Sequence, residues 1–141
     1  MRFKGILRYY FKQQINKTMR YERELFAYIK SNYIPDLVKP TDKYSAFDAY
    51  SPKHNTVFEL KCRRSHYPTL ILEEMKYSKL ASLGCNVRYV NSTPKGVFSF
   101  NLMKLDYDWV DMKMPKQTDF SNTNKVSKKI AYLNINDSTK I

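Results

Sequence analysis

A short segment, Thr56–Cys62, carries an acid and a base at the spacing of a β-strand. Because side chains alternate along a strand, Glu59 and Lys61 share one face, and the apolar side chains that flank them point to the other. A second acid, Asp48, stands eleven residues before Glu59. Two carboxylates beside an ammonium group suit Mg²⁺ or Mn²⁺, and such a set can activate a water molecule against a phosphodiester.

The elements expected around this segment would bring the two acids together. Residues 44–50 are predicted as a strand, residues 51–55 form a turn cluster, and residues 56–63 follow as the hairpin partner. In that hairpin Asp48 and Glu59 lie on neighbouring strands and, in the matching register, share one face. Asp36, which follows Pro35, is the alternative second acid.

A helix is predicted over residues 18–33, with Thr18 as a possible N-cap. Its apolar stripe is accompanied by Glu22, at helical spacing from the apolar residues that follow it. Acids are rarely placed on the inward edge of an amphipathic helix unless they are paired or functional, which makes Glu22 a candidate site residue. Glu24 is the alternative, and its position indicates the outer face of the helix.

A second helix is predicted from Pro68, which can open it, to Gly84, which can close it. Its lysines Lys76 and Lys79 fall near one side and are equal candidates for a cation beside the acids. The remaining expected strands are residues 86–90 and 97–105 and a final edge strand at 131–135.

The charge balance points to a polyanionic partner. The chain has 141 residues with 25 Lys and Arg against 13 Asp and Glu, a net charge of +12. Nucleic acid is the commonest partner of such a surface, and the 12 tyrosines add faces on which bases can stack. The alternative is a basic surface without a specific partner.

The length predicts one domain over residues 1–141. Within it we expect a basic N-terminal arm or helix at residues 1–17 and a polar basic loop at residues 115–129. The two cysteines, Cys62 and Cys85, have neither zinc-site spacing nor the number of a disulfide framework. With no apolar run of membrane length and no signal-like N-terminus, the sequence predicts a soluble, cytoplasmic protein without membrane contact.

The order of these elements and acids resembles that of the PD-(D/E)XK nuclease superfamily. The matching residues are Asp48 and Glu59-Leu60-Lys61, and the resemblance covers residues 18–92. The segment Tyr21–Leu25 is similar to the first-helix motif of archaeal-type Holliday junction resolvases. The segment 115–120 is similar to the tail of some phage-encoded members, which would place the protein in a host cytoplasm. The resemblance implies an α/β, restriction-endonuclease-like αβββαβ core with a mixed central sheet flanked by helices.

The resemblance also implies a role for each residue. Asp48, Glu59, the backbone carbonyl of Leu60 and, from the helix, Glu22 would bind or orient Mg²⁺ or Mn²⁺. Lys61 would orient the attacking water and stabilise the charge that builds on phosphorus. The second helix would add a positive charge over the phosphate, from Lys76 or Lys79. The expected nucleic-acid contacts are Arg20, Arg63, Arg64 and Lys79.

The implied activity is metal-dependent hydrolysis of DNA, with branched or junction DNA as the expected substrate of an endonuclease that acts as a homodimer. An exonuclease, a ribonuclease or RNA-binding module, and a non-catalytic DNA-binding protein on the same fold are the alternatives. The sequence offers little for other chemistries, because its two histidines, His54 and His66, cannot build a His-rich zinc site and no glycine-rich phosphate loop is present.

Overall fold

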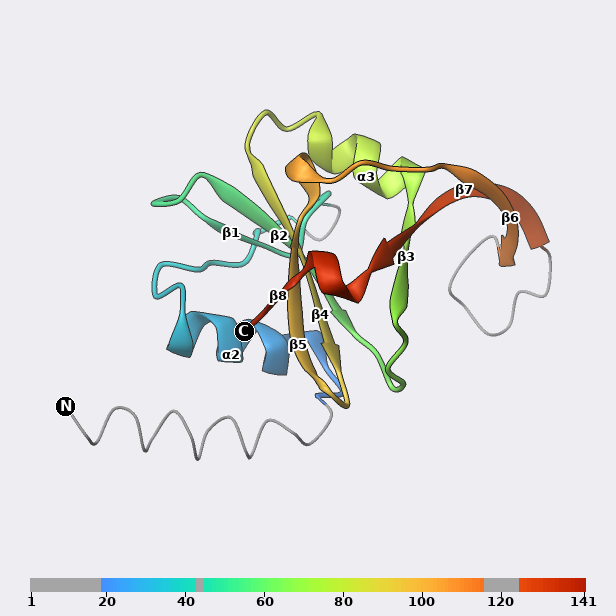
Figure 1. Ribbon diagram of the computed structural model, residues 1–141. Helices are drawn as coiled ribbons and strands as arrows, with labels where there is room; N and C mark the ends of the chain where they lie inside the picture. Colours follow the sequence, from blue (N-terminus) through green and yellow to red (C-terminus); the bar gives the residue numbers. More distant parts are fainter. Residues whose placement is uncertain (1–18, 43–44, 116–124) are drawn as a thin grey trace.

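The computed structural model of the chain describes residues 19–42, 45–115 and 125–141. Within these residues the larger of two β-sheets has five strands in the order β1-β2-β4-β5-β8. They are β1 (Ala49–Ser51), β2 (Thr56–Cys62), β4 (Asn86–Thr93), β5 (Gly96–Asn101) and β8 (Thr139–Lys140). The sheet is mixed, because β2 and β4 run parallel while the other neighbours are antiparallel (Figure 1).

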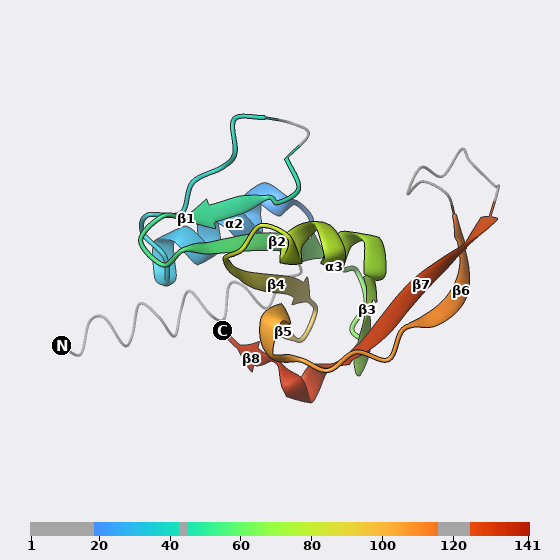
Figure 2. The same cartoon turned by 90° about the horizontal axis from the view of Figure 1, so that it is seen from above.

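The second sheet is antiparallel and has the order β3-β7-β6. Its strands are β3 (Thr69–Glu73), β6 (Val110–Pro115) and β7 (Lys125–Asn134). β7 pairs with β3 through its C-terminal half and with β6 through its N-terminal half. The part shared with β6 forms a two-stranded ribbon that extends away from the first sheet (Figures 1 and 2).

The α-helices of the described residues are α2 (Glu22–Asn32) and α3 (Glu74–Ala81), and their short 3₁₀ turns are η1 (Leu102–Lys104) and η2 (Ile135–Asp137). α2 is the helix predicted over residues 18–33, but it begins only at Glu22, after Tyr21. Thr18, the predicted cap, lies outside the described residues. No helix of the described part is long and apolar enough to cross a lipid bilayer.

The first sheet is covered on both faces. Helix α2 buries Leu25 and Ile29 against Phe58 and Leu60 on one face of β2. On the other face the side chains of β2, β4 and β5 pack against β3, α3 and the end of β7, with Leu70, Leu72, Leu80 and Phe100 fully or almost fully buried. A strand covered on both faces reads as a continuous apolar run, and β2 is buried at four consecutive positions, 57–60. One of these four is an acid, Glu59.

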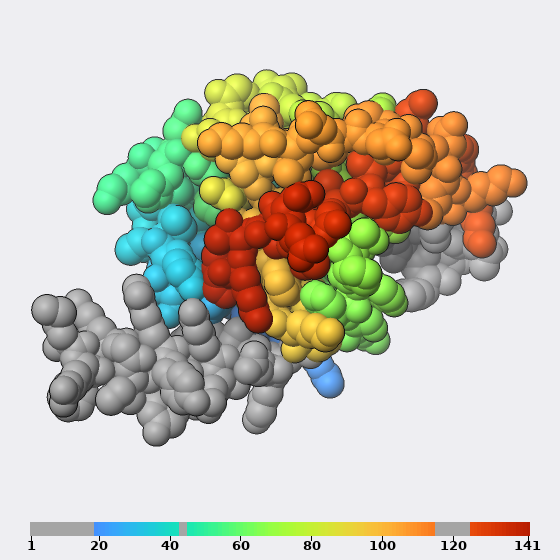
Figure 3. Space-filling model, viewed as in Figure 1, coloured from blue at the N-terminus to red at the C-terminus, as the bar shows by residue number. Residues whose placement is uncertain are grey.

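The end of the chain returns to the first sheet. After η2, β8 pairs with β5, and Ile141 N–H donates to the Val97 carbonyl oxygen at 2.9 Å. Figure 3 shows this C-terminal segment (red) lying across the middle of the visible face. Residues beyond 92 therefore complete the sheets, because β5 pairs with β4 and β7 pairs with β3.

The order α2-β1-β2-β3-α3-β4 is the predicted αβββαβ order, but only some of its strands are the expected ones. Before β1, Val38 makes an isolated bridge with Tyr50. The strand predicted over residues 44–50 is limited to Ala49–Ser51. The helix predicted from Pro68 to Gly84 is wrong for residues 69–73, which form β3 because Leu70 and Leu72 alternate into the core.

The last third of the chain also differs from the prediction. Residues 131–135 were expected to form an edge strand, but β7 is the central strand of the second sheet, with a neighbour on each side. The polar loop expected at 115–129 is wrong at both ends, because Pro115 ends β6 and residues 125–129 begin β7. Residues 116–124 and the arm at residues 1–17 lie outside the described residues.

The boundary between β3 and α3 can be tested with two apolar residues that a single helix would place on one side. Leu72 is 2% exposed and Met75 is 71% exposed. We expect Leu72→Ala to lower the free energy of unfolding by about 2–5 kcal/mol, because it leaves a cavity in the core. Met75→Ala should change it by less than about 0.5 kcal/mol. Chemical denaturation measures both, and equal losses would contradict the strand assignment.

Candidate active site

β2 presents Glu59 and Lys61 on the face opposite to helix α2. Phe58 and Leu60 pack beneath the helix, as strand alternation requires. Glu59 is only 4% exposed, whereas Lys61 is exposed. The sheet therefore carries a buried carboxylate and, two residues further along, a solvated ammonium group on the same face.

Asp48 is fixed against β2 by two hydrogen bonds. Its backbone N–H donates to the Phe58 carbonyl oxygen at 2.9 Å, which continues the β1–β2 pairing by one residue. Its carboxylate Oδ2 accepts from the backbone N–H of Leu60 at 2.8 Å. Together these bonds hold the carboxylate next to the two residues that flank Glu59, so the predicted neighbourhood of Asp48 and Glu59 is present in the structure.

Glu22, at the first residue of α2, reaches the same place from the helix side. Burial raises the pKa of its carboxyl group, and Asp48 raises it further through its charge and a side-chain hydrogen bond. Lys39 and Lys61 act in the opposite direction. Glu24, the alternative acid, instead lies close to Cys62: burial first, and then Glu24 and Glu22, raise the pKa of this thiol to about 11.

Helix α3 supplies the cation that faces Glu59. Lys76 Nζ lies 3.3 Å from Glu59 Oε2 and 3.4 Å from the carbonyl oxygen of Ala46. The ion pair does not satisfy Oε2, which has no well-aligned hydrogen-bond partner among the described residues. Burial raises the pKa of Glu59 to about 7, the charge of Asp48 raises it too, and Lys76 and Lys61 only partly oppose them. Lys79, the equal candidate on sequence grounds, is exposed.

Asp36 serves a different purpose from the other acids. Its carboxylate accepts from the Ser51 hydroxyl at 2.8 and 2.9 Å and from the Lys53 backbone N–H at 2.8 Å. These bonds hold the turn between β1 and β2, and the Lys53 N–H lowers the pKa of Asp36. Asp36 therefore stabilises the hairpin that carries Asp48 and Glu59.

The donor set fits a hard divalent cation in its chemistry. Asp48, Glu59 and Glu22 offer carboxylate oxygens. Burial, and then the charge of Asp48, raise the pKa values of Glu22 and Glu59, and one buried Glu59 oxygen lacks a hydrogen bond among the described residues. The side chains are not closed around a single point, however: in the described part of the chain no three His, Cys, Asp or Glu residues are grouped as a metal site. Since Asp48 is held by the Leu60 N–H, a cation could be enclosed here only if the Glu59 or Glu22 side chain turned toward Asp48.

Glu59 and Lys61 line a cleft of about 530 Å³ between the two sheets. Its wall from the second sheet includes Glu73 and Lys128, whose ammonium group lies 3.0 Å from Glu73 Oε1. Four basic and two acidic side chains line the cleft, together with apolar ones: Lys61, Arg63, Lys76, Lys128, Glu59, Glu73, Ile71, Leu72, Tyr89 and Met114. The sequence analysis missed Tyr89, Glu73 and Lys128, because each reaches the cleft through a pairing between distant parts of the chain.

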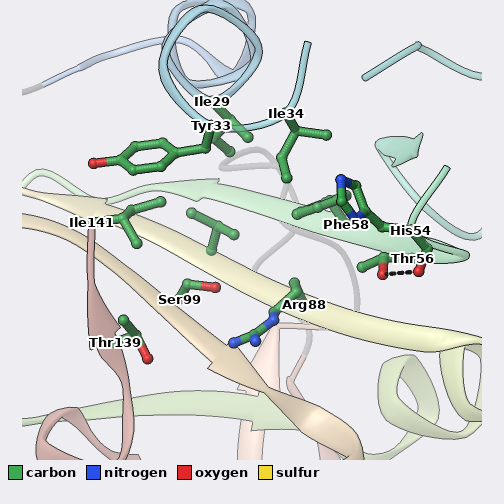
Figure 4. A pocket seen from close by; sticks show the side chains of 11 residues that line it. Ile29, Tyr33, Ile34, His54, Thr56, Phe58, Arg88, Ser99, Thr139 and Ile141 are labelled. Carbon is green, nitrogen blue, oxygen red and sulfur yellow. Dashed lines mark hydrogen bonds between the residues drawn. The ribbon is translucent and has the colours of Figure 1, made fainter. Parts of the chain in front are cut away.

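A second hollow, of about 300 Å³, lies under α2 on the other face of the sheet. Figure 4 shows Ile29, Tyr33 and Ile34 of the helix segment facing Phe58 and Arg88 of the strands. Among the described residues, no acidic side chain lines this hollow. It therefore offers no carboxylate for a cation, whereas four of the predicted site residues line the cleft on the opposite face: Glu59, Lys61, Arg63 and Lys76.

The arginines and lysine predicted to contact nucleic acid have different surroundings. Arg20, Arg64 and Lys79 are exposed and free to contact a large partner. Arg63 is half-buried in the wall of the cleft, with its side chain bonded to other residues of the protein. Adjacent arginines thus occupy different environments, a distinction that the sequence analysis did not make.

No family model and no curated protein matches this chain. Among solved structures it is similar to that of Hjc from Archaeoglobus fulgidus, described as a Holliday junction resolvase from an archaeal hyperthermophile. The TM-score is 0.55 at 15% sequence identity, over 89% of this chain and 92% of the other. This similarity confirms the predicted fold, a restriction-endonuclease-like α/β fold with a mixed central sheet.

The raised pKa of Glu59 predicts how stability depends on pH without metal. Between the ordinary value of 4.5 and about 7 the unfolded chain loses this proton while the folded protein keeps it, so stability falls as pH rises through about 7. Glu59→Gln removes this effect. In EDTA, we compare the free energy of unfolding of Glu59→Gln with that of the wild type. From pH 5 to pH 8 we expect this difference to shift by roughly 2–3 kcal/mol in favour of the variant. Chemical denaturation across this pH range measures these free energies, with the exposed Glu24→Gln as control. Parallel curves of unfolding free energy against pH for Glu59→Gln and the wild type would contradict the assignment.

Proposed function

We propose that the protein is a divalent-metal-dependent nuclease that hydrolyses DNA phosphodiester bonds. The observation that carries the proposal is Glu59, a buried carboxylate beside Asp48 in a cleft rich in basic side chains. A buried acid with a strongly raised pKa, next to a like charge in a cleft, is a typical mark of a catalytic site. The fold, shared with a junction resolvase, supports the same conclusion.

Asp48 and Glu59 would hold the cation, with Glu22 binding or orienting a water ligand from the helix and the Leu60 carbonyl oxygen as a further ligand. Bound Mg²⁺ or Mn²⁺ would supply a lowered pKa for a water molecule and a positive charge for a phosphate oxygen. Both ions prefer carboxylate, carbonyl and water oxygens. Because Asp48 also accepts from the Leu60 N–H, its orientation is fixed before any ion arrives.

Two lysines contribute positive charge without depending on the cation. Lys61 is exposed on the face of Glu59, where its ammonium group can orient an attacking water and stabilise the charge that develops on the phosphate. Lys76 holds the Glu59 carboxylate in the free protein. If Glu59 held a cation, Lys76 would be free to contact a phosphate oxygen.

The proposed substrate is branched or junction DNA, cut by an endonuclease. The net charge of +12 and the four basic side chains of the cleft suit a polyanion. The fold similarity to the archaeal resolvase and the Tyr21–Leu25 segment favour a junction as the first substrate to test. Cutting two strands of a junction with one active site per chain would require a homodimer.

The second candidate is a DNA-binding protein without catalytic activity. It is favoured by one observation: Glu59 is paired with Lys76, and the acids are not grouped around a common point. Both candidates predict salt-sensitive binding to DNA, so charge does not separate them. Metal-dependent cleavage does.

The test is cleavage of labelled linear duplex, single-stranded and four-way-junction DNA, and of matched RNA, in Mg²⁺, Mn²⁺ or EDTA. We expect cleavage of the junction in metal only, near the branch point. Glu59→Gln and Lys61→Met should each lower the single-turnover rate about 10²–10³-fold, because each removes a charge that acts on the transition state. Fragment patterns separate endonuclease from exonuclease cleavage.

The first turn of α2 offers a matched control. Glu22→Gln should lower the rate, whereas Glu24→Gln, two residues along the same helix, should leave it near that of the wild type. No cleavage in any metal, or cleavage that survives both Glu59→Gln and Lys61→Met, removes the catalytic proposal and leaves DNA binding. Preferential cleavage of RNA would correct the substrate.

A further inference from the structure

Arg63 joins three strands at the edge of the cleft. Its backbone N–H donates to the Ser92 carbonyl oxygen at 2.8 Å, which extends the pairing of β2 with β4 by one residue. Its side-chain Nε donates to Asn91 Oδ1 at 2.7 Å and its Nη2 to the Tyr89 hydroxyl at 2.8 Å. The same Nη2 lies 3.4 Å from the carbonyl oxygen of Ile71, on β3 of the second sheet.

The two side chains that Arg63 holds are the neighbours of the proposed catalytic pair. In the parallel register of β2 and β4, Tyr89 is the direct partner of Glu59, and Asn91 is the direct partner of Lys61. Tyr89 is 3% exposed and Asn91 is fully buried. Arg63 stands on the same face of β2, two residues beyond Lys61. It therefore bonds to the two side chains that lie beside Glu59 and Lys61 on the adjacent strand.

These contacts require the shape of a guanidinium group. Nε–H must meet an oxygen, so Arg63 fixes the Asn91 amide with Oδ1 toward it and leaves the NH₂ group without a hydrogen-bond partner among the described residues. Nη2 reaches the Tyr89 hydroxyl, which itself donates to the Ile71 carbonyl oxygen at 3.3 Å. A lysine at this position would keep the charge, but its single ammonium group cannot reproduce the planar fork.

The bonds to Ile71 cross from one sheet to the other. The cleft lies between these sheets, with Glu59 and Lys61 on one wall and Ile71 and Glu73 on the other. Arg63 and Tyr89 both bond to the Ile71 carbonyl oxygen, so they help to set the distance between the walls. Arg64, by contrast, is exposed and makes no hydrogen bond or ion pair with the residues that the structure describes.

We propose that Arg63 is a positioning residue, which holds Tyr89 and Asn91 beside Glu59 and Lys61 and fixes the width of the cleft, rather than a residue that binds substrate phosphate. The catalytic part of this proposal rests on the proposed nuclease function. The structural part concerns the free protein and holds with or without cleavage.

Charge-preserving and charge-removing substitutions at the two adjacent arginines separate the two roles. A positioning role predicts that Arg63→Lys behaves like Arg63→Gln: both lower the melting temperature by several degrees and the single-turnover rate at saturating junction DNA by about tenfold or more. Neither should change the slope of log Kd for DNA against log salt. A phosphate contact predicts instead that Arg63→Lys is close to wild type and that Arg63→Gln reduces the slope by about 0.9.

Arg64 is the matched control. Arg64→Lys and Arg64→Gln should leave the melting temperature unchanged, because the Arg64 side chain is exposed and takes no part in this network. Should an Arg63 variant fail to fold, Tyr89→Phe removes one hydroxyl from the same network without changing charge. It should lower the melting temperature and the rate in the same direction, with the DNA affinity and its salt slope unchanged.

A readout that needs no substrate is the exchange of arginine Nε–H protons in ¹⁵N-labelled protein. One protected, slowly exchanging Nε–H signal should be present in wild type, absent in Arg63→Lys and retained in Arg64→Lys. If the wild type cuts no DNA, the proposed function fails, while this signal and the melting temperatures still decide whether Arg63 holds the network. Wild-type stability and rate in Arg63→Lys, or an unprotected Nε–H, would overturn the proposal.

Discussion

The placement of one carboxylate, Glu59, between two packed layers constrains the rest of this structure. β2 is paired on both edges and covered on both faces, and an ionised group there loses most of its hydration. The like charge of Asp48 disfavours the ionised form of Glu59 further, and the attraction of Lys76 offsets only part of the effect of burial. An apolar side chain at this position would stabilise the fold more. The presence of an acid at so costly a position is the strongest physical argument that Glu59 serves a function.

The second sheet explains how the fold can accommodate the buried carboxylate of Glu59. β3 leads directly into α3, so the connection that forms one wall of the cleft also delivers Lys76 to Glu59. β7 lies beside β3 and brings Lys128 to Glu73 on the same wall. The carboxylates of the cleft are thus each opposed by a lysine from another element. Each of these pairs links two elements that line the cleft.

The sequence could predict those parts of the site that depend on short-range geometry. Alternation within β2 places Glu59 and Lys61 on one face, and a hairpin of few residues places Asp48 beside them. It could not locate β3, because an apolar run that includes Leu70 and Leu72 suits either a strand or a buried helix. What decided between them was pairing with β7, some sixty residues later, where Leu70 faces Leu133. The αβββαβ order was therefore correct, although the predicted strands were partly different ones.

Some functional residues were not predicted from the sequence, and for some of these a local pattern was nevertheless present. Tyr89 and Lys128 depend on the register between strands that are distant in the chain, which no local pattern provides. Arg63 is different. Alternation continued two residues beyond Lys61 already places Arg63 on the face of Glu59 and Arg64 on the opposite side. On that face, near a buried acid and the adjacent strand, hydrogen-bond acceptors of the protein itself lie within reach of an arginine side chain. Strand periodicity, extended past the end of the apolar run, would therefore have separated the two arginines.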